Sequence, residues 1–375
     1  MSEKISIKEL LKGVEVEWIT LGNEDFVEVA NSGRKPVKAS LRVSGENPYY
    51  GANNIQDYVR GYTHDGIYVL IAEDGSASLE NYSIQYTKGK FWANNHVHVI
   101  RGKEKLNTRF LYHYLSIVNF MPYLTGGGRA KLTKGRMLEI SIPIPPLNIQ
   151  NEIVRILDNF TELTAELTAE LTARKKQYSY YRDKLLTFED GEVEFKTLGK
   201  LAENLDSKRK PITSGLRDAG EIPYYGASGI VDYVKDYIFD GDFLLVSEDG
   251  ANLLARNTPI AFSISGKSWV NNHAHVLKFD TYAERRFVEI YLNSIDLTPY
   301  ISGAAQPKLN QQNLNNIKIP NPSLSEKERI VNILDKFDTL TNSIREGLPK
   351  EIELRQKQYE YYRDLLLTFP KKEEQ

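Results

Sequence analysis

Cysteine is absent from all 375 residues of this chain. The absence excludes a disulfide framework, a thiolate zinc site and a cysteine nucleophile, and it fits a reducing compartment. Long hydrophobic runs are missing too, because the apolar stretch at residues 66–72 is far too short to span a bilayer. The first residues mix both charge signs and do not resemble an export signal. We therefore expect a cytoplasmic protein with no membrane partner.

Excess charge of either sign is also missing, since 48 basic residues face 50 acidic ones and the net charge is −2. Global charge therefore predicts neither nucleic acid nor membrane as a partner, and any such binding depends on local patches. Hydrophobic residues make up 41% of the chain and charged ones 26%, which is typical of a globular protein with real cores. The length indicates more than one domain.

Motifs of common enzymes are absent as well. The chain has no G-x-x-x-x-G-K-[ST] phosphate loop, G-x-G-x-x-G turn, H-E-x-x-H or G-x-S-x-G. Asn47-Pro48-Tyr49-Tyr50 superficially resembles the Asn-Pro-Pro-Tyr motif of adenine methyltransferases, but it lacks the second proline and its duplicate begins with Ile222. We interpret it as a turn leading into a strand.

The chain contains two copies of one unit. The matched segments keep their order at an offset of 175 to 177 residues, which excludes coincidence. Arg34-Lys35-Pro36 matches Arg209-Lys210-Pro211, Pro48-Tyr49-Tyr50-Gly51-Ala52 matches Pro223-Tyr224-Tyr225-Gly226-Ala227, Glu73-Asp74-Gly75 matches Glu248-Asp249-Gly250, Asn94-Asn95-His96-Val97-His98 matches Asn271-Asn272-His273-Ala274-His275, and Lys131-Leu132 matches Lys308-Leu309.

Each copy has two parts with different periodicity. Short strands and turns at residues 17–147 and 191–324 predict an α+β domain, whereas apolar steps of three and four at 148–190 and 325–369 predict long amphipathic helices. Gly347 and Pro349 should break or kink the second helix. The simplest way to bury two matching seams is an antiparallel coiled coil; the alternative is that each helix packs only on its own domain. The helical segment 1–16 and the tail 370–375 complete the chain, and the echo of Leu185-Leu186 in Leu10-Leu11 predicts a circular pseudo-twofold repeat with adjacent termini.

The paired histidines are one candidate site. His96 and His98, like His273 and His275, are two residues apart, which places both on one face of a strand and matches metal-ligand spacing. We favour a buried, hydrogen-bonded pair that holds an asparagine turn, with a DNA-facing role as the next alternative, and we expect no metal.

Local charge points to a second candidate. Residues 18–147 carry 15 basic and 11 acidic side chains, residues 195–324 carry 14 of each, and the rest of the chain is acidic. Small-residue loops at 126–136 and 303–312 let a backbone approach phosphate while long donors reach bases; ordinary solvated turns are the alternative. The expected DNA contacts are Arg34, Lys35, Tyr50, Arg129, Lys131, Thr133, Lys134, Arg209, Lys210, Tyr225, Gln306, Lys308, Asn310 and Gln312.

The order of these motifs, followed by Ile-Pro-x-Pro and a helix opening Ile-Val-x-Ile-Leu-Asp, resembles the target recognition domain and helical spacer of type I restriction-modification specificity subunits. The resemblance occurs twice and covers essentially the whole chain. It implies two α+β target recognition domains and an antiparallel coiled coil. It also implies binding of a bipartite sequence in double-stranded DNA, and assembly with two methyltransferase subunits and two restriction/translocase subunits. S-adenosylmethionine, ATP and Mg would then belong to those partners. The resemblance also implies that this chain carries no catalysis itself and needs no cofactor of its own.

Residues 164–173 add a subclass feature. Thr164-Ala165-Glu166-Leu167 recurs at 168–171, which resembles the TAEL repeats in the first spacer helix of one type I subclass. Four helical residues add about 6 Å and a net rotation of about 40°, whereas one base pair adds about 3.4 Å and 36°. We hypothesise that the number of TAEL units sets the gap between half-sites; a plain helix filler is the alternative.

Two other functions remain open at this stage. One is an autonomous two-headed DNA-binding or architectural protein without enzyme partners. The other is a metal-dependent nuclease that uses the paired histidines. Because the two copies are so similar, we expect related half-sites read in opposed orientation.

Overall fold

The computed structural model describes residues 10–126, 130–189, 191–303 and 306–370. The chain forms two compact units. Unit 1 contains Met1–Thr168 and Glu351–Gln375, and unit 2 contains Ala169–Lys350. The first and last described residues, Leu10 and Pro370, therefore belong to unit 1, where the indole N–H of Trp18 donates to the carbonyl of Pro370 at 3.2 Å. This contact agrees with the circular repeat predicted from the sequence.

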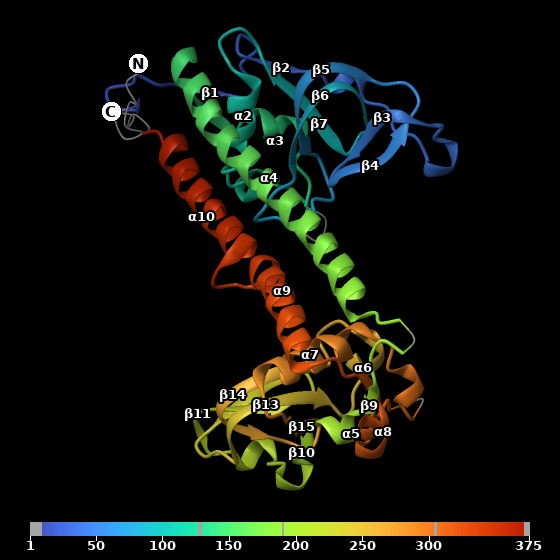
Figure 1. The fold of residues 1–375 in the computed structure, drawn as a ribbon. Coiled ribbons are helices and arrows are strands. Elements are labelled where there is room, and N and C mark those ends of the chain that lie inside the picture. Colours follow the sequence, from blue (N-terminus) through green and yellow to red (C-terminus); the bar gives the residue numbers. More distant parts are fainter. Residues whose placement is uncertain (1–9, 127–129, 190, 304–305, 371–375) are drawn as a thin grey trace, which may run out of the picture. The chain divides into compact units, whose positions relative to one another are not determined.

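Unit 1 contains a six-stranded sheet in the order β2-β7-β5-β6-β3-β4 and a small sheet of β1 and β8 (Figure 1). The strands are β1 (Glu17–Thr20), β2 (Val27–Val29), β3 (Ser44–Gly51), β4 (Asn54–Val59), β5 (His64–Ala72), β6 (Ile84–Ala93), β7 (Val97–Gly102) and β8 (Ser141–Ile144). Helices α2 (Thr108–Leu115) and α3 (Lys134–Leu138) follow the sheet, and α2 packs on β5, β6 and β7. We call the part from β1 to β8 domain 1.

Unit 2 repeats this arrangement, with the strand order β10-β15-β13-β14-β11-β12 and a small sheet of β9 and β16. Its strands are β9 (Phe195–Thr197), β10 (Glu203–Asn204), β11 (Ala219–Gly226), β12 (Gly229–Val234), β13 (Phe239–Ser247), β14 (Ala261–Val270), β15 (Ala274–Lys278) and β16 (Lys318–Pro320). Its helices are α5 (Leu198–Leu201), α6 (Asn252–Ala255), α7 (Tyr282–Ser294) and α8 (Gln311–Asn316). We call the part from β9 to β16 domain 2. The predicted α+β fold and its duplication are confirmed.

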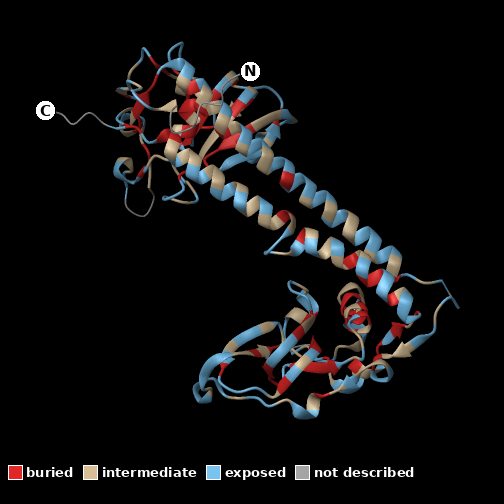
Figure 2. Ribbon diagram, turned by 60° about the vertical axis from the view of Figure 1, so that its left-hand side comes forward, coloured by how far each residue is buried: buried red, intermediate tan, exposed pale blue. Residues whose placement is uncertain are grey.

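The central strands are apolar because both of their faces are covered. Residues 68–72 of β5 and 243–247 of β13 are buried throughout. Buried residues gather in the sheets of both domains (Figure 2). In each domain every described strand pair is antiparallel except one, the pairs β3–β6 and β11–β14. The predicted turn at residues 47–50 is wrong, because these residues lie inside β3. Pro48 is tolerated there because β6 pairs only with the next two residues, Tyr49 and Tyr50.

The predicted long helix is α4 (Leu147–Leu186), and aromatic pairs join it to the second helical segment. In unit 1, Phe160 of α4 stacks on Tyr362 of α10 (Gly347–Leu367), with ring centroids 5.3 Å apart. In unit 2, Tyr181 of α4 stacks on Phe337 of α9 (Leu324–Asn342) at 5.7 Å. The partner number falls as the α4 number rises, so the pairing is antiparallel, as the seams predicted.

The second helical segment is interrupted between α9 and α10, where a break was predicted. Gly347 adopts a φ of +79°, and a Cβ atom there would lie 2.5 Å from the carbonyl oxygen of Thr339. Only glycine fits this turn without strain. Among the residues that the structure describes, no helix is both long and apolar enough to cross a membrane.

Candidate nucleic-acid interface

One carboxylate in each domain collects the motifs that recur in the sequence. In domain 1, Glu73 follows β5, and its carboxylate lies 2.5 Å from the Arg34 guanidinium and 3.0 Å from the Lys131 ammonium. Nδ1 of the buried His98 lies 3.7 Å away. The Glu73 N–H donates to the carbonyl of His96 at 2.8 Å. We call the group of Glu73, Arg34, Lys131 and His98 hub 1.

Domain 2 builds the same group around Glu248, which we call hub 2. The Glu248 carboxylate lies 2.6 Å from Arg209, 3.1 Å from Lys308 and 3.8 Å from Nδ1 of His275. Its N–H donates to the carbonyl of His273 at 2.9 Å. Four motifs that lie far apart in the sequence therefore meet at one point in both domains. The sequence identified these motifs but missed that the Glu-Asp-Gly carboxylate joins them; its recurrence at offset 175 was the available signal.

The electrostatics of both hubs favour ionised carboxylates. Burial by itself raises the pKa of Glu73, but hydrogen bonds from Arg34 and Lys131 outweigh it and lower the pKa below the usual glutamate value. The pKa of Glu248 is likewise lowered, because Arg209, His275 and Lys308 together outweigh the effect of burial. Each carboxylate is thus held as an anion by cations of its own domain.

Each hub fixes the segment that contains the Lys-Leu pair, residues 130–134 in domain 1 and 307–311 in domain 2, which we call Lys-Leu segments 1 and 2. The Leu132 N–H donates to the Glu73 carbonyl at 2.7 Å, and the Leu132 carbonyl accepts from Nε2 of His98 at 2.7 Å. Leu309 makes the corresponding contacts with Glu248 and His275 at the same distances. Each segment therefore has its backbone bound to the end of the central sheet.

Both Lys-Leu segments lead directly into a short helix. Thr133 is the N-cap of α3, and its hydroxyl accepts from the Arg136 N–H at 3.4 Å. Asn310 is the N-cap of α8, and its side-chain oxygen accepts from the Asn313 N–H at 2.9 Å. Such caps fix where the helix begins, so the exposed first residue of α3, Lys134, has a defined position relative to hub 1.

The predicted DNA contacts divide into exposed and internal side chains. The side chains of Lys35, Lys134, Lys210, Gln306, Lys308 and Gln312 are exposed. Arg34 and Arg209 instead point into the hubs, where each also donates to a backbone carbonyl at 2.9 Å, that of Val97 or Ala274. Tyr50 is 7% exposed and packs edge-on against Phe91, while Tyr225 is half-buried. Arg129 lies outside the described residues.

The prediction of buried histidine pairs is half wrong, because only the second histidine of each pair is buried. His96 lies in the turn before β7, is exposed, and sits 2.5 Å from Asp74, whereas His98 is fully buried. The predicted asparagine turn is present, since the Asn94 side chain accepts from the His96 N–H at 2.8 Å.

Asp206, Glu248 and His275 are the one described group with metal-ligand spacing. Arg209 lies 3.3 Å from Asp206 and 2.6 Å from Glu248. Nε2 of His275 is hydrogen-bonded to the Leu309 carbonyl. A guanidinium thus already occupies the position of a cation, and these residues do not fit a metal ion.

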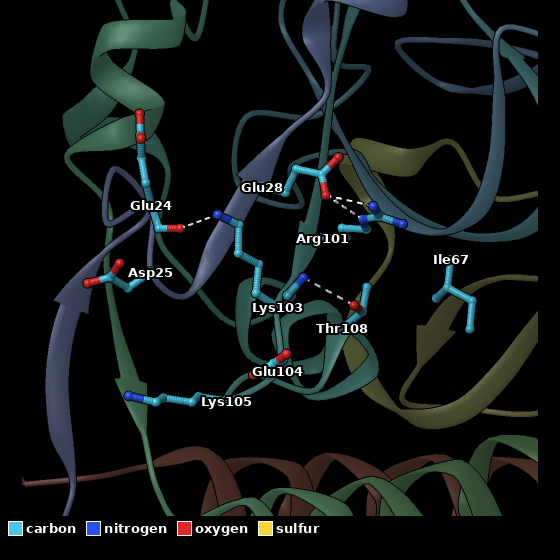
Figure 3. Close-up of a pocket in the computed structure, with 10 residues that line it drawn as sticks. Glu24, Asp25, Glu28, Ile67, Arg101, Lys103, Glu104, Lys105 and Thr108 are labelled. Atoms are coloured by element: carbon cyan, nitrogen blue, oxygen red, sulfur yellow. Dashed lines mark hydrogen bonds and ion pairs between the residues drawn. The ribbon is translucent and has the colours of Figure 1, made fainter.

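A hollow of about 730 Å³ lies elsewhere on domain 1 and differs in charge from the hubs (Figure 3). Four carboxylate side chains and three basic ones line it, and its Arg101 is paired with Glu28 at 2.7 Å. The Lys103 ammonium reaches the backbone carbonyl of Glu24. Excess carboxylate repels phosphate, so this hollow does not suit DNA.

Comparison with known proteins agrees with the geometry. The family model described as type I restriction modification DNA specificity domain matches residues 15–174 and 190–354. A putative type I restriction enzyme specificity subunit of Haemophilus influenzae is 48% identical over 97% of this chain and 98% of its own length. The EcoR124I/EcoR124II type I restriction enzyme specificity subunit of Escherichia coli is 35% identical over 100% of this chain and 99% of its own.

Solved structures share the fold. The S subunit of a type I restriction-modification system from M. genitalium has a TM-score of 0.67 at 15% identity, over 96% of this chain and 98% of its own. A chain from a study of type I R-M complex assembly has a TM-score of 0.54 at 14% identity, with 94% and 97% coverage. With two matched domains, each with its own hub and Lys-Leu segment, the chain belongs to the DNA specificity subunits of type I restriction-modification systems.

Proposed function

We propose that each α+β domain reads one half of a bipartite DNA target through its Lys-Leu segment and the residues around it. The observation that supports this most directly is the duplication of the hub in a chain of the specificity-subunit family. Two copies of the same hub and Lys-Leu segment in one chain are suited to binding two separated half-sites. The chain itself carries no catalytic step in this proposal.

The exposed predicted residues divide by chemistry between phosphate and base contacts. Lys35, Lys134 and Lys210 are long, exposed cations suited to phosphate oxygens. Gln306 and Gln312 are exposed amides that can pair with adenine in the major groove. Arg129 remains a proposed base contact, and Thr133 and Asn310 would act mainly by placing the helix starts. Arg34, Arg209, Tyr50 and Tyr225 would support the surface from beneath.

Lys131 and Lys308 have a dual character. Their ammonium groups lie near the hub carboxylates, yet 45% and 52% of their side-chain surfaces remain exposed. A lysine with three donors can hold a carboxylate and a phosphate at once. We propose that these two lysines connect the internal frame to the DNA backbone.

The partners proposed for this chain are two methyltransferase subunits and two restriction/translocase subunits, acting in the cytoplasm. Two of each follows from the duplication, because equivalent surfaces on two units can each hold one copy of the same partner. S-adenosylmethionine, ATP and Mg would be bound by those partners.

The uninterrupted helix α4 carries the TAEL units at residues 164–171. We propose that one unit changes the gap between half-sites by about one base pair, since its net rotation of about 40° is close to the twist of one base-pair step. The rise of about 6 Å exceeds that of one base pair, so only the rotation of one TAEL unit matches one base-pair step.

Native mass measurement tests the assembly. The chain is co-expressed with the type I methyltransferase subunit of its own system and purified by a tag on the methyltransferase. We expect a complex of one copy of this chain and two methyltransferases that methylates adenine, while this chain alone does not. Specific DNA binding by the chain with no such complex would instead support the autonomous DNA-binding alternative.

A further inference from the structure

The hub carboxylates are too enclosed to be DNA contacts. The side chain of Glu73 is 15% exposed and that of Glu248 is 11% exposed, and both face cations of their own domain. A carboxylate also repels the phosphate backbone. If these carboxylates contribute to DNA recognition, they do so through the arginine and lysine side chains that they hold in place.

Three polar contacts join Lys-Leu segment 1 to Glu73 and its neighbour His98. They are the Lys131 ammonium on the Glu73 carboxylate, the Leu132 N–H on the Glu73 carbonyl, and Nε2 of His98 on the Leu132 carbonyl. Leu132 itself is fully buried. The segment is thus fixed through both its backbone and its lysine.

The two domains keep this frame and change the outward residues. Glu, Arg, Lys and His recur at the hub with distances that agree within about 0.1 Å. The exposed Lys134, by contrast, is replaced by the exposed Gln311 at the equivalent position of domain 2. A constant frame with variable outward side chains is what two readers of different sequences need, because a reader must be held rigidly to discriminate bases.

We infer that Glu73 and Glu248 are positioning residues for DNA discrimination, each acting on its own half-site. This inference rests on the proposed function and assigns to the carboxylate of the Glu-Asp-Gly motif a role that the sequence did not reveal. Glu73 sets the position of Lys-Leu segment 1 and of the start of α3, and Glu248 does the same for segment 2 and α8.

The test uses the complex of this chain with its methyltransferase. Methylation rates are measured on the target and on single-base variants of each half-site for Glu73→Gln and Glu248→Gln. The matched control is Glu28→Gln, which removes a carboxylate from the Glu28–Arg101 ion pair of the same domain, away from the hub.

We expect Glu73→Gln to lower discrimination in one half-site by about tenfold, as for one poorly read base pair, and to leave the other half-site unchanged. Glu248→Gln should show the mirror result, and Glu28→Gln should change neither. Equal loss in both half-sites, or unchanged discrimination, would overturn the inference. If wild type methylates no bipartite target, the proposed function fails first.

Glu73→Asp covers the case in which the glutamine variant does not fold. It keeps the charge but withdraws it by one methylene, so the Lys131 contact should lengthen while the domain stays folded. We expect a smaller loss of discrimination in the same half-site, with faster hydrogen exchange of the Lys131 and Leu132 amides. Slow exchange with full discrimination would contradict the positioning role.

Discussion

The side-chain amide of Asn31 donates to Nδ1 of His98 at 2.9 Å, and Nε2 of the same ring faces the Leu132 carbonyl at 2.7 Å. A ring with one donor and one acceptor neighbour is satisfied as neutral imidazole with its proton on Nε2. In domain 2 the residue equivalent to Asn31 is Asp206, which lies 2.6 Å from Nδ1 of His275. Both nitrogens of His275 therefore face acceptors, so Nδ1 of this ring donates where Nδ1 of His98 accepts.

Nitrogen-15 spectra of the histidine side chains at pH 7 check this difference. We expect His98 as the neutral Nε2–H tautomer, and a proton on Nδ1 of His275 that Nδ1 of His98 lacks. Asp206→Asn should remove the Nδ1 proton of His275, because the new amide can donate to Nδ1. The same proton positions in both wild-type rings, or an Nδ1 proton that persists in Asp206→Asn, would contradict this expectation.

The stability of unit 1 should fall as the pH drops below about 6.5, the ordinary histidine pKa. Burial lowers the pKa of His98 and of His113 in the folded chain. Below the ordinary value the unfolded chain binds protons that the folded chain does not, so the free energy of unfolding decreases by up to about 1.4 kcal/mol per pH unit for each group. The decrease ends once the pH is below the folded values.

His113→Gln isolates one of these groups. Its ring Nε2 lies 2.8 Å from Asp158, and a glutamine amide can keep that bond. Hydrogen exchange of the β5 amides, measured from pH 7.5 to 5, should show a shallower loss of stability in the variant. An unchanged slope would assign the pH dependence to other groups.

Lys134 and Gln312 test one half-site each, although the position equivalent to Lys134 is Gln311. Both are exposed in the first turn of a short helix, one in each domain. Lys134→Ala should weaken binding to all sequences by a similar factor and reduce the salt dependence by about one phosphate contact. Gln312→Ala should relax base preference in the other half-site, at a cost of about 1–3 kcal/mol. Uniform loss from Gln312→Ala would reassign it to phosphate binding.

Deletion of residues 168–171 tests the proposed role of the TAEL units. The helix stays continuous, because the deletion removes about one turn with no glycine or proline. We expect the methylated motif to keep both half-sites and lose about one base pair from the gap. Substitution of the same four residues by four alanines is the control and should keep the gap. An unchanged gap after deletion would reduce these units to a helix filler.

The local and repeated features could be predicted from the sequence. Apolar spacing predicted the ends of α4 to within a few residues. The duplicated seams predicted that the two helical segments pack together, and Phe160 and Tyr362 make one of the contacts between them. The break at Gly347 could be predicted because glycine and the nearby Pro349 disfavour a continuous helix. These features depend on neighbours along the chain or on the comparison of two copies.

The hubs could not be predicted, because they depend on contacts between distant residues. Arg34 and Glu73 are 39 positions apart, and nothing in either motif indicates that the guanidinium points inward. In the same way, the sequence did not show that Tyr50, an expected DNA contact, is buried against Phe91. Spacing suggested that His96 and His98 share a face, but the turn at Asn94 ends just before β7 and separates their environments.

Sequencing for N6-methyladenine in cells that contain this chain and its methyltransferase tests the central claim most directly. We expect methylation at one split motif with two specific halves and a fixed gap, and loss of discrimination in a single half when either Glu73 or Glu248 is replaced. Methylation at a continuous motif, or a motif that does not change when this chain is exchanged for another specificity subunit, would contradict it.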